Sequence, residues 1–96
     1  MTLNPDIIKR MKESSVKPWK VVMLNDDKTT LSFVIEILQN VFGHNETSAN
    51  LSAVLLHQAG RVIAGVYSKE LAELKIQQCH CAARKQKFPL SCYLEG

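Results

Sequence analysis

The chain has 96 residues, which suffices for one domain with a real core but not for two. It is 46% hydrophobic and 22% charged, with no apolar run approaching the length of a membrane span and no apolar signal segment near its start, so we expect a cytoplasmic protein that is not bound to a membrane. The net charge of +3 lies in residues 1–20, whereas residues 21–96 hold seven basic and seven acidic side chains, which argues against a nucleic-acid-binding surface.

The first segment, residues 1–17, is rich in charged side chains and carries Pro5 and two adjacent serines. Its few apolar residues could form one short amphipathic turn but no packed element, so we predict a flexible N-terminal extension. The folded core domain is then expected to cover residues 18–96.

The core is predicted to begin with a strand over residues 19–24, because Val21 to Leu24 form a continuous apolar run rich in β-branched residues. Three short polar side chains, Asn-Asp-Asp at 25–27, are turn and cap chemistry and should end it. After Thr29 or Thr30 as the N-cap, apolar residues recur at helical spacing over residues 31–42, and Gly43 should terminate that helix.

The second half of the chain repeats this alternation of elements. Asn45 is the expected cap of a helix over residues 46–59, and Ser68 that of a helix over residues 69–86. Strands are predicted at 61–67, where Gly65 indicates a bulge or a close backbone approach, and at 90–94. The order strand, helix, helix, strand, helix, strand predicts a compact α+β sandwich, a three-stranded antiparallel sheet with helices packed on one face.

Three cysteines in a chain without an export signal indicate free thiols in a reducing compartment. Cys79 and Cys81 flank His80, but side chains two residues apart on a helix point about 200° away from each other, so they cannot close on one ion. We therefore predict no metal site and no cofactor, with Cys79 in the core and His80 in solvent.

The helix at 31–42 has more than one apolar face, which indicates that part of it lines a hydrophobic pocket with a polar lip. Asn25 offers a carbonyl oxygen, Asp26 a carboxylate and His57 a neutral imidazole lone pair. Three acceptors beside an apolar pocket would suit a primary amine attached to a hydrophobic side chain, such as the N-terminus of a polypeptide. The alternative is that Asn-Asp-Asp is only a turn and His57 only a surface residue, since spacing alone does not bring them together.

Three stretches of the sequence are recognisable in combination. These are the strand followed by Asn-Asp-Asp, the His-x-x-Gly before a strand containing Gly-Val-Tyr, and the closing Pro-Leu-x-Cys-x-Leu-Glu. Together they resemble the ClpS family of ATP-dependent Clp protease adaptors over essentially all of residues 18–96. The resemblance implies a βααβαβ fold and N-end rule recognition: binding of N-degron substrates that begin with Leu, Phe, Tyr or Trp, and their delivery to an AAA+ unfoldase of the ClpA or ClpC class.

The resemblance also implies a role for individual residues. The amine-binding positions of the family fall on Asn25, Asp26 and His57, and residues 1–17 match its extension that engages the unfoldase. The positions that line its hydrophobic pocket fall on Leu31, Val34, Ala53, Leu56 and Leu90. Many members carry Met where this chain has Leu31 and Ala53, and the smaller Ala53 predicts an altered preference, either toward Trp or toward β-branched Ile and Val.

Two rival interpretations remain beside this one. An enzyme is disfavoured, because the chain has neither a nucleophile signature nor a Gly-rich phosphate loop. A non-catalytic interaction module that modulates the unfoldase without an N-degron pocket is the second, and the presence of Asn25, Asp26 and His57 together argues against it. We expect a monomer.

Overall fold

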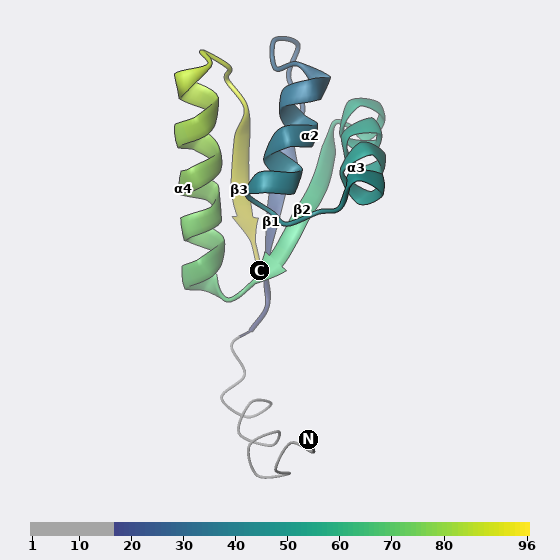
Figure 1. Ribbon diagram of the computed structural model, residues 1–96. Helices are drawn as coiled ribbons and strands as arrows, with labels where there is room; N and C mark the ends of the chain where they lie inside the picture. The colour runs from purple at the N-terminus through teal and green to yellow at the C-terminus, as the bar shows by residue number, and fades with distance from the viewer. Residues whose placement is uncertain (1–16) are drawn as a thin grey trace.

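The computed structural model describes residues 17–96, and the predicted N-terminal extension lies outside this range except for its last residue (Figure 1). The predicted order of elements is confirmed. Its members are β1 (Trp19–Leu24), α2 (Leu31–Asn40), α3 (Glu46–Ala59), β2 (Arg61–Tyr67), α4 (Lys69–Lys85) and β3 (Ser91–Glu95).

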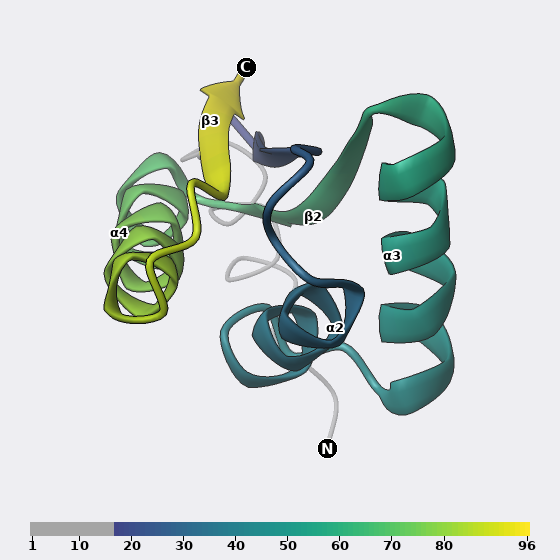
Figure 2. The same ribbon diagram turned by 90° about the horizontal axis from the view of Figure 1, so that it is seen from above.

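The three strands form one antiparallel sheet in the order β2-β1-β3, so the first strand lies in the centre. The three helices cover one face of the sheet, with α3 and α4 at opposite sides and α2 between them (Figure 2). Val21 and Met23 point into the core that these helices enclose, and both are fully buried. This confirms the α+β sandwich with helices on one face.

The helix caps expected from the sequence are present. Side-chain oxygens of Thr30, Asn45 and Ser68 accept hydrogen bonds from backbone N–H groups in the first turns of α2, α3 and α4. Each cap satisfies an N–H group that would otherwise lack a partner at the start of the helix. Local sequence chemistry therefore determines where the helices start.

The C-terminal ends of two helices and the limits of the last strand differ from the prediction. Helix α2 ends at Asn40 rather than residue 42, because the N–H of Phe42 bonds to the carbonyl of Ile37, five residues back instead of four. Gly43 lies beyond the cap, Val41, and takes the left-handed φ of 70°. Helix α4 ends one residue early, and β3 begins and ends one residue late.

Strand β2 contains the irregularity that Gly65 predicted. The pairing with β1 shifts between Val21 and Val22, so that Ala64 has no partner on β1. His44 links this bulge to α3: its Nε2 donates to the carbonyl of Ala64 at 2.6 Å, and its Nδ1 makes a hydrogen bond with the Ser48 hydroxyl at 2.8 Å. The bulge is thereby tied to the first turn of the helix that carries His57.

The environment of the cysteines is partly as predicted. Cys79 is fully buried in the core, and its Sγ lies 3.7 Å from that of Cys92. His80 was expected in solvent, and this was wrong: its Nε2 accepts the backbone N–H of Cys92 at 3.0 Å. Strand β3 is at the edge of the sheet and lies beside α4, so a helix side chain can satisfy an N–H group that has no strand partner.

Within residues 17–96, no helix has both the length and the apolar character needed to span a membrane.

Candidate functional site

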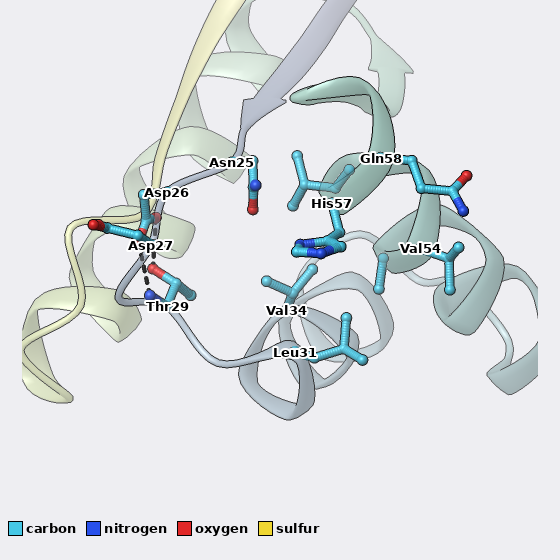
Figure 3. A pocket seen from close by; sticks show the side chains of 11 residues that line it. Asn25, Asp26, Asp27, Thr29, Leu31, Val34, Val54, His57 and Gln58 are labelled. Atoms are coloured by element: carbon cyan, nitrogen blue, oxygen red, sulfur yellow. Dashed lines mark hydrogen bonds between the residues drawn. The ribbon is translucent and has the colours of Figure 1, made fainter.

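A cavity of about 510 Å³ opens where β1 ends, between the loop after that strand, α2 and α3 (Figure 3). Its lining residues are Asn25, Asp26, Asp27, Thr29, Leu31, Val34, Ala53, Val54, Leu56, His57 and Gln58. One part of this wall is polar and the other apolar. All three predicted amine-binding residues and four of the five predicted pocket residues are in this set.

Asn25 and His57 line the same cavity because β2 follows α3 directly in the chain and pairs with β1. Leu24 is paired with Arg61, and the backbone N–H of Asn25 donates to the carbonyl of Gly60 at 2.9 Å. Gly60, between α3 and β2, allows the chain to turn from the helix into the strand, because it adopts a left-handed φ of 84°. The last turn of α3, with His57, is therefore held against the end of β1, a placement that the spacing of the residues had left open.

Asn25 and His57 present exposed polar side chains at the cavity. Both are exposed, and within residues 17–96 neither the carboxamide nor the imidazole makes a hydrogen bond. Figure 3 shows both side chains directed toward the cavity from different elements, the loop after β1 and the last turn of α3. They supply an amide oxygen and an imidazole lone pair at the mouth.

Asp26 has a structural role in the loop. Its Oδ1 accepts the backbone N–H groups of Lys28 and Thr29 at 2.8 and 2.7 Å, and its Oδ2 accepts the Thr29 hydroxyl at 2.7 Å. Partial burial by itself would raise the pKa of Asp26, but these hydrogen bonds and the positive charge of Arg84 outweigh that effect and lower it. The Asp26 carboxylate thus stays ionised near neutral pH at the lip of the cavity, where the exposed Asp27 side chain also lies.

The apolar part of the cavity has a buried floor and an open rim. Val34, Ala53 and Leu56 are 4%, 1% and 2% exposed and form the floor, whereas Leu31 is 52% exposed at the rim. Leu90, the fifth predicted pocket residue, is 1% exposed within the core and is not among the residues that line the cavity.

Four lining residues were not singled out from the sequence. Asp27 and Thr29 lie in the same loop as Asp26, while Val54 and Gln58 share one side of α3 with His57. Helical spacing could have identified both, since Val54 lies three residues before His57 and Gln58 lies four residues after Val54, and residues three or four apart on a helix project in similar directions.

The residues that line the cavity offer hydrogen-bonding groups and apolar surface. The Thr29 hydroxyl is engaged by Asp26, and the cysteines of α4 and β3 are not among the lining residues. Residues 17–96 contain no group of three or more His, Cys, Asp or Glu side chains placed to hold a metal ion. What the cavity offers is hydrogen-bond acceptors and negative charge above an apolar floor.

Comparison with known proteins gives the family. The model of the family described as "ATP-dependent Clp protease adaptor protein ClpS" matches residues 14–93. The chain belongs to the ClpS family. It is therefore a Clp protease adaptor and not an enzyme, as the sequence indicated.

Individual relatives agree with this assignment. The ATP-dependent Clp protease adapter protein ClpS of Hydrogenovibrio crunogenus is 41% identical over 86 residues, which cover 90% of this chain and 83% of that protein. That of Desulforapulum autotrophicum is 38% identical over 102 residues, covering 99% and 98%. Among solved structures, Agrobacterium tumefaciens ClpS2 bound to L-phenylalaninamide is similar, with a TM-score of 0.79 at 30% identity, covering 82% of this chain and 95% of that one.

Proposed function

We propose that this adaptor binds the free α-amino group and the bulky hydrophobic side chain of N-degron substrates and delivers them to a Clp AAA+ unfoldase of the ClpA or ClpC class. The observation that carries the proposal is the pairing of two acceptors, Asn25 and His57, at the mouth of a cavity with an apolar floor; neither side chain makes a hydrogen bond within residues 17–96.

The mouth suits an ammonium group. An ammonium has three N–H donors and one positive charge. Asn25 and His57 each accept one hydrogen bond, and the Asp26 carboxylate, ionised and close by, supplies the counter-charge, directly or through water. An acetylated N-terminus has neither the charge nor enough donors, so acetylation should abolish binding.

The floor suits a bulky apolar side chain. Val34, Ala53 and Leu56 present buried aliphatic atoms, and such contact favours a large hydrophobic residue over a small one. The related ClpS2 structure contains L-phenylalaninamide, a molecule with a free α-amino group and an aromatic side chain. The small side chain of Ala53 leaves room that we assign to Trp, or to β-branched Ile and Val.

The remaining elements of the proposal concern delivery. Residues 1–17 engage the unfoldase, residues 18–96 form the N-degron-binding domain, and the adaptor works as a monomer. Removing residues 1–17 should leave peptide affinity unchanged and abolish delivery, measured as degradation of an N-degron substrate by the reconstituted protease.

The decisive experiment is fluorescence anisotropy with peptides identical except for a first residue of Leu, Phe, Tyr, Trp, Ile, Val or Ala, each with an acetylated twin. The free peptides with bulky residues should bind at about micromolar affinity, roughly −8 kcal/mol, and their twins should not. If no free peptide binds, or acetylation makes no difference, the chain is better described as a module that modulates the unfoldase without an N-degron pocket.

A further inference from the structure

Helix α3 carries an apolar surface on its solvent side that contributes nothing to the core. Leu51, Val54 and Leu55, here called the α3 shoulder, are 60%, 43% and 44% exposed. Their spacing of three and four residues places them on one stretch of helix surface. The side chains that α3 buries are instead Ala49, Ala53 and Leu56. A group of aliphatic side chains left in water beside a binding cavity points to a contact made on binding.

The α3 shoulder is continuous with the cavity. Val54 belongs to both, because it lines the cavity and is nearly half exposed. Leu31, at 52% exposed, lines the cavity from α2, and Figure 3 shows both Leu31 and Val54 beside the cavity. At 100° per residue, going round α3 away from the floor, Leu51 follows Val54 at about 60° and Leu55 follows it at about 100°.

A bound polypeptide would reach this surface. With its amine at Asn25 and His57 and its first side chain on the floor, the substrate has its first carbonyl at the mouth. Each further residue extends the chain by at most about 3.3–3.6 Å, and one helix turn rises about 5.4 Å. Leu55 lies two residues before His57, about 3 Å along the axis, and Leu51 lies six residues before it, about 9 Å along the axis. Two further residues span up to about 7 Å of backbone, and their side chains supply the remaining reach to the α3 shoulder.

We infer that the α3 shoulder, with Leu31, is a second apolar contact of the same site that selects substrates with a hydrophobic residue at their second or third position. This inference rests on the proposed function. None of these four side chains carries a charge or a hydrogen-bonding group, so the contact distinguishes apolar from polar residues and tolerates many apolar shapes.

The test measures peptide affinity by fluorescence anisotropy on the full chain, with free peptides and their acetylated twins. Peptides beginning Phe-Leu and Phe-Ser test the second position, and peptides beginning Phe-Ser-Leu and Phe-Ser-Ser test the third. Leu at the second or third position should improve affinity about fivefold over Ser, the size expected from partly burying one aliphatic side chain. In the variant Leu51→Ser/Leu55→Ser this preference should vanish, while the affinity for Phe-Ser-Ser stays the same.

A matched control comes from α4. Leu71 and Leu74 are 41% and 47% exposed, and α4 covers the same face of the sheet as α3 but lies at its opposite edge, beside β3 (Figure 2). The variant Leu71→Ser/Leu74→Ser makes the same chemical change and should keep the fivefold preference.

Four results would overturn the inference. The first is equal affinity of the wild type for Leu and Ser peptides, and the second is an unchanged preference in Leu51→Ser/Leu55→Ser. The third is self-association of the wild type that this variant abolishes without altering the peptide ranking, which would assign the α3 shoulder to a second copy. In the fourth, free Phe-Ser-Ser binds no better than its acetylated twin, which overturns the proposed function itself and the inference with it.

Discussion

Replacing Asp26 separates two roles that one carboxylate combines. Its two oxygens accept three hydrogen bonds within the loop, two from backbone N–H groups and one from the Thr29 hydroxyl. Asp26→Asn keeps an oxygen for the N–H groups of Lys28 and Thr29 and turns an amide N–H toward the hydroxyl, which can then accept. Asp26→Ala removes the charge and all three acceptors.

The two variants should differ in stability. The donors are exposed or part-buried, so water replaces part of what Ala removes, and we expect Asp26→Ala to lose about 1–2 kcal/mol of unfolding free energy, or about 5–10 °C in Tm. Asp26→Asn should lose less than about 1 kcal/mol near neutral pH. The pKa of Asp26 is lower in the folded state than its ordinary value of 3.8. The ionised carboxylate therefore adds to the unfolding free energy above pH 3.8, and this stabilisation is lost as the pH falls through the folded-state pKa.

Both variants should bind peptides more weakly by a similar factor, because both remove the negative charge of Asp26. At roughly 6 Å and an effective dielectric constant of about 40, removing one counter-charge from an ammonium costs about 1.4 kcal/mol, or about tenfold in Kd. Anisotropy titration and thermal melts of the two variants measure both effects. Asp27→Asn is the control, since it makes the same charge change at a side chain that makes no hydrogen bond within residues 17–96. If Asp26→Asn binds free peptides as tightly as the wild type, Asp26 is a loop residue and plays no part in holding the amine.

Three further predictions concern the pocket and the sheet. His57→Ala should weaken binding of free peptides by about 1 kcal/mol in the anisotropy assay, because the mouth of the cavity loses one hydrogen-bond acceptor. An unchanged affinity would remove His57 as an acceptor. Ala53→Met should weaken Trp and Ile peptides relative to Leu peptides by about 1–3 kcal/mol in the same assay, and an unchanged ranking would show that Ala53 does not set the preference. Gly65→Ala places a Cβ 2.5 Å from the Tyr67 hydroxyl and 2.6 Å from its ring, and should cost about 1–3 kcal/mol in a denaturant titration; wild-type stability would mean that the ring moves aside freely.

Much of the fold could be read from the sequence, because its signals are local. The caps Thr30, Asn45 and Ser68 satisfy N–H groups within three residues of themselves, and the apolar spacing of each helix repeats every turn. The ends of α2 and α4 were less predictable, because they depend on which carbonyls the following loops bond to.

The sequence by itself determined the order of elements, the α+β class and the chemistry of the residues available for a site. Only the tertiary structure decided which of them meet: the pairing of Leu24 with Arg61 carries His57 to Asn25, and the packing of α4 beside β3 engages His80. Leu90 is buried in the core, while Val54 joins the cavity wall. The physical reason is the separation of the interacting residues along the sequence. Helix caps and apolar periodicity act within a turn or two, whereas strand register and helix packing join residues tens of positions apart. The pocket forms only where those long-range contacts are made.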